Sequence, residues 1–234
     1  MSLSFEQFLN LDLNFPGISF GYESWALESY LNVLEDQIAH ARAQYRLRAE
    51  RELESRRKEL EDFEYGNKLS EIDEAADAQI PRFFRIGAVV SIWGLFESFA
   101  SDFALYSGNR EKPGLSFRDI RADSLRAQVE KYFEKVLRID LPWSQREREQ
   151  LGQLQELRHF LAHRNGRLMD LPTQSVEKIR SLVSRIPGVE IESSTVVVSP
   201  EYVSEASALV FKTIGELGQL LANRYGGPVA PTEA

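Results

Sequence analysis

The sequence contains no cysteine and only three histidines. The absence of cysteine excludes disulfide bonds, cysteine metal ligands and a cysteine nucleophile, and it removes the usual mark of a secreted domain. Basic residues are also outnumbered, with 28 Lys and Arg against 36 Asp and Glu, for a formal net charge of −8. Because broad nucleic-acid binding depends on many Lys and Arg meeting phosphates, this balance argues against it. A nucleic-acid site in this protein must be local.

Other familiar signatures are missing too. The sequence has no P-loop, no Rossmann glycine pattern and no internal repeat. The segment Met1-Ser-Leu has no basic stretch ahead of an apolar one, so we expect no signal peptide. The long apolar stretch at 80–107 contains Glu97 and Asp102, which favours a buried helix over a membrane span. We therefore expect a cytoplasmic protein without a cofactor or a membrane partner.

Helical periodicity and mixed charge mark the first third of the chain. We predict a helix that begins near Tyr22 to Ser24, with an apolar seam formed by Leu31, Leu34, Ile38, Ala41 and Tyr45. From 46 to 64 charges of both signs are nearly continuous, which is typical of a solvent-exposed helix with i,i+4 ion pairs. Gly66-Asn67 is expected to end this helix before a short one at 68–78. Residues 1–79 thus form, by prediction, an N-terminal helix and a projecting arm.

The rest of the chain is predicted to be a helical core, 80–225, with one small hairpin. Its expected elements are a central helix at 80–107, an amphipathic helix at 122–138, a motif helix at 144–165, a short helix at 173–186 with a capping box at Thr173, a β-hairpin at 189–198 and a closing helix at 201–225. Ser144 and Glu147 have the spacing of a capping box on the motif helix. The last residues, 226–234, are expected to be a disordered tail. The predicted fold class is all-α.

The motif helix carries the most distinctive polar residues. On a helical wheel, one arc holds four leucines, Leu151, Leu154, Leu157 and Leu161. Arg158 falls inside this apolar arc, whereas His159 and His163 lie on the opposite, polar side with Glu156. A guanidinium in an apolar setting needs a carboxylate or carbonyl partner, because an unpaired buried charge is costly.

Glu97 is the predicted partner of Arg158. It is the only charge in the middle of the central helix, in the sequence Leu-Phe-Glu-Ser-Phe. Arginine suits a buried carboxylate, since its planar guanidinium can donate two parallel hydrogen bonds. We expect the two residues to pair across two core helices.

The order of these parts resembles the HEPN (higher eukaryotes and prokaryotes nucleotide-binding) superfamily. The resemblance covers about 80–225 and rests on the central helix with Glu97, on Trp143, and on the motif helix ending Leu-Arg-His-x3-His-Arg-Asn-Gly. Its signature is an arginine, a polar residue directly after it, and a histidine after four to six intervening positions. Arg158, His159 and His163 match it, although asparagine is commoner at the second position. The hairpin before the last helix is similar to the branch in prokaryotic defence and toxin–antitoxin neighbourhoods.

The resemblance implies metal-independent RNA cleavage at a homodimer interface. In such a reaction the ribose 2′-OH attacks the adjacent phosphate and leaves a 2′,3′-cyclic phosphate and a 5′-OH. The expected catalytic residues are Arg158, His163 and His159, with Glu97 and Asn165 in support and Arg164 and Arg167 as RNA-phosphate contacts. An imidazole suits proton transfer near neutral pH, and arginine suits phosphate charge. Expected partners are a second copy, RNA, and an antitoxin or nucleotidyltransferase protein.

Other interpretations of the same residues stay open. Arg158 and Glu97 can form a purely structural ion pair, with both histidines solvated. The four-residue spacing of His159 and His163 also fits two zinc ligands, but no glutamate follows His159 as in H-E-x-x-H, so we predict no metal site. Asn165-Gly166 has the form of a helix stop, with glycine in the left-handed conformation. The alternative function is a non-catalytic, HEPN-like dimeric scaffold that binds nucleotide, RNA or a protein partner.

Overall fold

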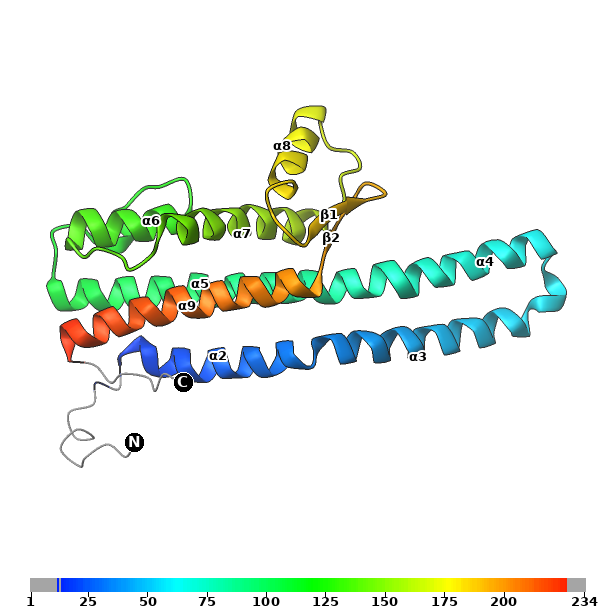
Figure 1. Ribbon diagram of the computed structural model, residues 1–234, viewed down its shortest axis with the longest axis horizontal. Helices are drawn as coiled ribbons and strands as arrows, with labels where there is room; N and C mark the ends of the chain where they lie inside the picture. Colours follow the sequence, from blue (N-terminus) through cyan, green and yellow to red (C-terminus); the bar gives the residue numbers. More distant parts are fainter. Residues whose placement is uncertain (1–11, 13, 227–234) are drawn as a thin grey trace, which may run out of the picture. The chain divides into compact units, whose positions relative to one another are not determined.

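The computed structural model describes residue 12 and residues 14–226. This part of the chain is mostly helical, with one short antiparallel hairpin, so the predicted all-α fold class is confirmed (Figure 1). The elements are α2 (Pro16–Asn32), α3 (Leu34–Ser55), η1 (Arg57–Glu59), α4 (Asp62–Glu74), η2 (Ala75–Gln79), α5 (Ile80–Glu111), η3 (Phe117–Asp119), α6 (Leu125–Lys131), η4 (Tyr132–Leu137), α7 (Gln145–Arg164), α8 (Thr173–Val183), β1 (Val189–Glu192), β2 (Thr195–Val198) and α9 (Pro200–Tyr225). The predicted tail, 226–234, lies outside the described residues apart from Gly226.

The described residues form two compact units whose segments alternate along the chain. The bundle unit consists of the described residues within Met1–Glu28, Ser91–Glu156 and Glu205–Ala234. The motif unit consists of Ser29–Val90 and Leu157–Ser204. The long helices α2, α5, α7 and α9 therefore each contribute residues to both units.

Aromatic side chains fill the core of the bundle unit. Phe20 of α2 packs edge-on against Phe99 of α5, with 5.2 Å between the ring centroids, and Phe96 of α5 lies 5.8 Å from the ring of Trp143. The indole nitrogen of Trp143 donates a hydrogen bond of 2.9 Å to the carbonyl of Thr213 in α9. These large rings remove much apolar surface from water, so they tie α2, α5 and α9 together.

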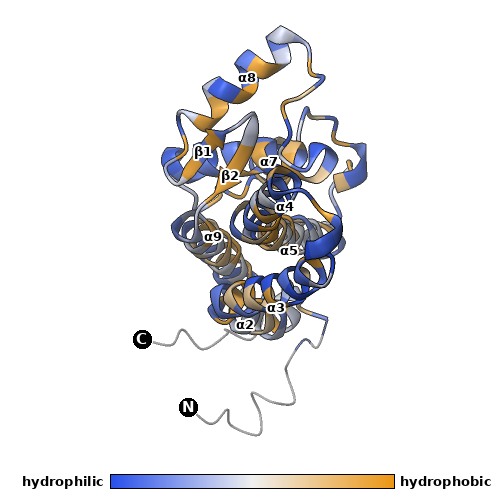
Figure 2. Cartoon of the chain, turned by 90° about the vertical axis from the view of Figure 1, so that its right-hand side faces the viewer, coloured by the Kyte–Doolittle hydropathy of each residue, from blue (hydrophilic) through white to orange (hydrophobic). Residues whose placement is uncertain are grey.

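The motif unit contains a helical hairpin made of α3 and α4 (Figure 1). Leu34, Ile38 and Leu53 form the buried side of α3, and the remainder of this helix is strongly hydrophilic (Figure 2). The guanidinium of Arg46 donates to Asp73 at 2.8 Å and to Asp77 at 2.7 Å. These ion pairs join α3 to the returning helix, whereas the sequence predicted pairs between successive turns of one helix.

The predicted start of the first helix is wrong, because α2 begins at Pro16 and not near Tyr22. Proline fits the first turn of a helix, where its missing N–H is not needed and its fixed φ is helical. The earlier start of the helix is stabilised by packing, because Phe15 and Phe20 are both buried. The ring of Phe15 lies 5.7 Å from that of Phe103.

The predicted interruption at Gly66-Asn67 is also wrong. Both residues lie inside α4, and the chain turns earlier, between Ser55 and Asp62. A capping box between Glu61 and Glu64 starts α4. Arg57 pairs with Asp62 and lies 4.5 Å above the ring of Tyr65, which fixes the turn. A helical glycine costs only about 1 kcal/mol, so it does not have to end a helix.

Most later elements match their predictions, with shifted ends. The hairpin is confirmed, with Val189 opposite Val198 and a turn at Ser193-Ser194 in which both φ angles are positive. The central helix extends to Glu111, and the helix predicted at 122–138 begins at Leu125 with the Ser124 side chain as its cap. The capping box predicted at Thr173 is wrong, since Pro172 precedes α8 and no side chain caps it. Figure 2 shows the mixed hydrophilic and hydrophobic character of α8.

Among the described residues, the continuous helical stretch Asp62–Glu111 is long and apolar enough to cross a membrane, judged by length and composition alone. Half of its most apolar window is buried inside the protein. The core helix of a soluble protein has this property, because neighbouring helices cover its apolar surface.

Candidate active site

A charged cluster anchors the start of the motif helix α7. The backbone N–H and the hydroxyl of Ser144 both donate to the Glu147 carboxylate at 2.7 Å, and the Glu147 N–H donates back to the hydroxyl at 3.3 Å. The predicted capping box is therefore confirmed. Lys212 of α9 lies 2.5 Å from the other carboxylate oxygen. Hydrogen bonds from Lys212 and then Ser144 lower the pKa of Glu147 from 4.5 to about 2.

The two faces of α7 have the burial that the helical wheel predicted. Leu151, Leu154, Leu157 and Leu161 are fully buried. His159 and His163 are exposed, and Arg158 is half-buried. Glu97 is half-buried on α5 and belongs to the bundle unit, whereas Arg158 belongs to the motif unit. The pairing of Arg158 with Glu97 stays a prediction.

The end of α7 is built by left-handed residues and by the hairpin. Asn165 has φ 51° and Gly166 has φ 74°, so the predicted helix stop is confirmed. A β-carbon at Gly166 would lie 2.9 Å from the carbonyl oxygen of Val196, so only glycine fits without a shift. The Gly166 carbonyl accepts a hydrogen bond from the Val196 N–H at 2.8 Å. Arg167 lies opposite Thr195 in a β-bridge, so β2 fixes the backbone that carries Arg167.

A pocket of about 460 Å³ lies at this end of α7, and we call it the α7-end pocket. Its lining residues are Ala162, His163, Arg164, Asn165, Arg167, Met169 and Asp170. Four of the predicted site residues therefore share one pocket: His163, Asn165, Arg164 and Arg167. The ring of His159 is 4.5 Å from that of His163, one turn earlier on the same helix. Two guanidiniums, of Arg164 and Arg167, against the one carboxylate of Asp170 give this pocket a positive balance.

Arg82, in the first turns of α5, is a charged residue that the sequence did not single out. It is only 9% exposed, and its Nε atom has no hydrogen-bond partner. Burial lowers the pKa of Arg82, and so does repulsion from the guanidinium of Arg167, while Glu74 raises it. The only hint in the sequence is its position inside an apolar stretch.

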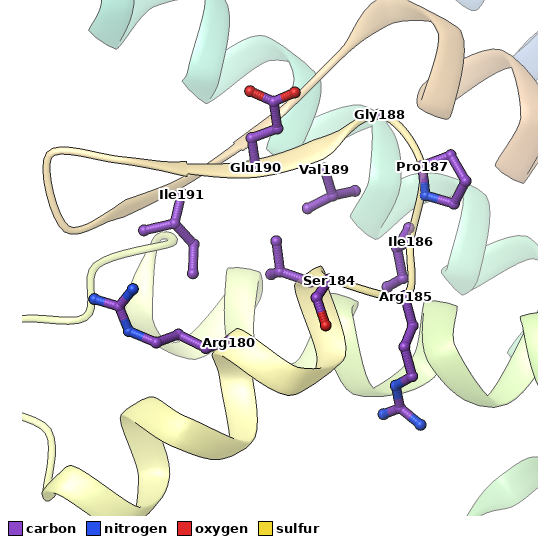
Figure 3. Close-up of a pocket in the computed structure, with 10 residues that line it drawn as sticks. Arg180, Ser184, Arg185, Ile186, Pro187, Gly188, Val189, Glu190 and Ile191 are labelled. Carbon is purple, nitrogen blue, oxygen red and sulfur yellow. The ribbon is translucent and has the colours of Figure 1, made fainter.

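Two other cavities are weaker candidates for an active site than the α7-end pocket. Figure 3 shows one of about 500 Å³ between α8 and β1, where Val189 and Ile191 point toward α8 and Glu190 points to the opposite side. Its Arg185 already donates from Nε to the Ser181 carbonyl at 3.0 Å. Arg185 is therefore already hydrogen-bonded to its own helix, and the Glu190 carboxylate points away from α8.

The second cavity, of about 760 Å³, lies in the bundle unit and is lined by Asp12, Tyr106 and Arg110 among others. The Tyr106 hydroxyl donates to Asp12 at 2.8 Å, and this bond together with Arg110 lowers the pKa of Asp12. Asp12 and Arg110 therefore already pair with each other, while burial raises the pKa of Asp102, which lines the same cavity.

Comparison with known proteins adds no relative to this description. Neither the protein-family models, nor the curated proteins, nor the solved structures give a significant match to this chain. Across residues 12 and 14–226, no cluster of three or more His, Asp or Glu side chains is placed to hold a metal ion. The α7-end pocket is thus the candidate site on the grounds of its own residues.

Proposed function

We propose that this protein is a metal-independent endoribonuclease of the HEPN type that acts through the α7-end pocket. The observation that carries the proposal is the convergence of His163, Arg164 and Arg167 on one pocket at the end of the motif helix. An imidazole beside two guanidiniums combines a proton-transfer group with anion binding, which phosphodiester cleavage requires. The acidic net charge of the whole chain fits an enzyme that contacts few phosphates.

The proposed reaction uses His163 of this pocket together with Arg158 and His159, which precede it on α7. His163 takes the proton of a ribose 2′-OH while the 2′ oxygen forms a bond to the adjacent phosphorus. The bond from phosphorus to the 5′ oxygen breaks, and the imidazolium returns its proton to that oxygen. The products are a 2′,3′-cyclic phosphate and a 5′-OH. Arg158 stabilises the negative charge on the phosphate, and His159, whose ring is tilted against that of His163, orients the imidazole or the substrate.

A cleavage assay in EDTA tests this proposal. Single-stranded RNA is incubated with the wild-type protein, His163→Ala and His159→Ala, and the product ends are analysed. We expect cyclic phosphate ends from the wild type, reduced cleavage by His159→Ala and none by His163→Ala. His40→Ala is the matched control, because His40 is the one other histidine of the chain and lies exposed on α3, outside the motif helix.

Two results would remove the enzymatic proposal. One is a wild-type protein that leaves every RNA intact, and the other is His163→Ala protein that cuts as fast as wild type. Either result leaves the non-catalytic scaffold, which binds nucleotide, RNA or a protein partner through the same face. Circular dichroism on each variant separates lost chemistry from lost folding.

The biological setting is part of the same proposal. We infer a cytoplasmic homodimer whose motif helices approach each other, with a role in prokaryotic toxin–antitoxin systems or phage defence and an antitoxin or nucleotidyltransferase partner. Exposed His159 and His163 would then face a shared substrate channel. Light scattering at micromolar concentration tests the dimer, and a monomer at that concentration contradicts it.

A further inference from the structure

The strand β1 has one edge that pairs with β2 and one edge that does not. The far edge of β2 is covered, because the Val196 N–H donates to the Gly166 carbonyl at 2.8 Å. The Leu168 N–H likewise donates to the Ser194 carbonyl. Among residues 12 and 14–226, by contrast, no strand pairs with the outer edge of β1. An unpaired strand edge is a place where another chain can add a strand.

The hydrogen-bond register shows which backbone groups of β1 point outward. The Ser199 N–H donates to the Gly188 carbonyl at 2.8 Å, so these two residues form a hydrogen-bonded pair. Such pairs alternate along an antiparallel ladder, so Glu190 and Glu192 direct their N–H and C=O groups at β2. Ile191, between them, directs both groups away from β2. Within the part of the chain that the structure describes, neither group of Ile191 has a backbone partner.

The two faces of β1 carry different side chains. Val189 and Ile191 point toward α8, and Glu190 points to the opposite side (Figure 3). Glu192 follows the same alternation as Glu190, and both glutamates are exposed. The cavity of about 500 Å³ lies between β1 and α8, and Val183 of α8 forms part of its wall. A strand added to β1 would therefore meet an apolar wall on one face and two carboxylates on the other.

The charges beside β1 decide which kind of strand fits. Side chains of an added strand that lie next to Glu190 and Glu192 face two negative charges, so lysine or arginine is favoured there. A second copy of β1 would place its own glutamates on that face, where like charges repel. RNA is disfavoured for the same reason. On the other face, Arg180 lines the cavity with Val183, so an apolar side chain fits there and a basic one does not.

We propose that the outer edge of β1 binds an extended segment of a partner protein as an added strand, with apolar residues facing α8 and basic residues facing Glu190 and Glu192. The N–H and C=O of Ile191 each take a partner on this strand, and the cavity receives an apolar side chain. The surface shares no residue with the α7-end pocket, so the inference does not depend on the proposed nuclease activity.

Synthetic peptides test the proposal on the whole protein. The probe is a short, blocked, fluorescent peptide that alternates lysine and valine, and the comparison peptide has glutamate in place of each lysine. In fluorescence anisotropy, we expect the lysine peptide to bind at least about tenfold more tightly than the glutamate peptide. Equal affinities would overturn the proposal.

N-methylated peptides separate strand pairing from charge attraction. The N–H groups of successive residues point to opposite edges of a strand. N-methylation of one set, either the valines or the lysines, should therefore prevent binding, and N-methylation of the other set should not. The same result for both sets would contradict strand addition.

Charge reversal on β1 tests the two carboxylates. Glu190→Lys/Glu192→Lys should reverse the preference, so that the glutamate peptide binds more tightly than the lysine peptide. The matched control is Glu50→Lys/Glu52→Lys, which makes the same change at the same spacing on exposed residues of α3 in the same unit. The control should keep the wild-type preference. Equal shifts in both double variants would indicate attraction by net charge alone and would overturn the proposal.

Amide hydrogen exchange locates the added strand. Binding of the lysine peptide should slow exchange of the Ile191 N–H by at least about tenfold, and the N–H groups of Glu190 and Glu192, already directed at β2, should change less. Ile191→Pro removes the outward donor without removing a hydrogen bond to β2, so it should abolish binding. Ile191→Val keeps the donor and should bind as the wild type does. If Ile191→Pro does not fold, the exchange measurement on the wild type decides the question.

Other occupants of this edge would give different results. Slow exchange of the Ile191 N–H without peptide, increasing with protein concentration, would show that a second copy pairs here and would overturn the proposal. Polyuridylate that protects this N–H when the lysine peptide does not would also overturn it. So would a lysine peptide that binds without any change at Ile191.

Discussion

Replacement of Glu147 by glutamine tests how the motif helix is anchored. The glutamine keeps an oxygen that accepts the two hydrogen bonds from Ser144 but removes the charge that pairs with Lys212. A pKa of about 2 in place of 4.5 corresponds to roughly 3 kcal/mol of stability at neutral pH, since one pKa unit is worth about 1.4 kcal/mol. Lys212 is 57% exposed, so solvent screens part of this energy. We expect Glu147→Gln to lower the free energy of unfolding by about 1–2 kcal/mol.

The contribution of Glu147 to the free energy of unfolding should depend on pH. The pKa of Glu147 is lowered in the folded state, so its contribution is fully present above pH 4.5 and is lost as the pH falls from 4.5 through about 2. Urea unfolding, followed by circular dichroism at several pH values, should show wild type and Glu147→Gln converging over that window. Adding Lys212→Met to Glu147→Gln should cost little more, because the ion pair is already broken.

The matched control is Glu149→Gln, which removes an exposed carboxylate two residues further along α7. Its effect on stability should be within about 0.5 kcal/mol, as for most surface substitutions. The reasoning is refuted if the difference between wild type and Glu147→Gln stays constant from neutral pH to pH 2. It is also refuted if Glu149→Gln costs as much as Glu147→Gln.

Three further substitutions test individual packing and backbone features of the described residues. Gly166→Ala should lower the free energy of unfolding by about 1–3 kcal/mol, because of its φ of 74° and the close carbonyl of Val196. Gly66→Ala, in open space on α4, should instead raise it by about 0.5–1 kcal/mol in the same urea titrations; equal signs for the two would contradict this account. Trp143→Phe should cost about 1–3 kcal/mol, because the hydrogen bond to Thr213 is lost in the core; an unchanged urea midpoint would show that this bond contributes nothing.

The sequence predicted a helix end or a turn correctly where residues close together in the chain determine the local structure. Ser144 and Glu147 are three positions apart and cap α7 by their own hydrogen bonds, so the start of that helix was predictable. Asn165-Gly166 ends the helix because glycine tolerates the left-handed conformation. The hairpin followed from two short runs of β-branched residues around Ser193-Ser194.

Tertiary contacts decided the features that the sequence missed. Pro16 starts α2 because Phe15 and Phe20 are buried against distant aromatic rings, which local propensity does not register. Gly66 stays helical in α4 for a different reason, since the chain already turns a few residues earlier, where Arg57 meets Asp62 and Tyr65. The turn between α3 and α4 is therefore fixed by contacts of these long side chains and not by Gly66.

Some features of the candidate site were also predictable from the sequence, and others depend on the tertiary structure. The identity and spacing of His159 and His163 were visible in the sequence, because helical periodicity places both on the exposed side of α7. The position of Arg167 depends on its bridge to β2, some 28 residues further along the chain, and the burial of Arg82 depends on the packing of α5. The sequence determined which helix carries the imidazoles, and only the tertiary structure fixed Arg167 in the pocket that His163 lines, since the backbone of Arg167 is held by a bridge to a strand far along the chain.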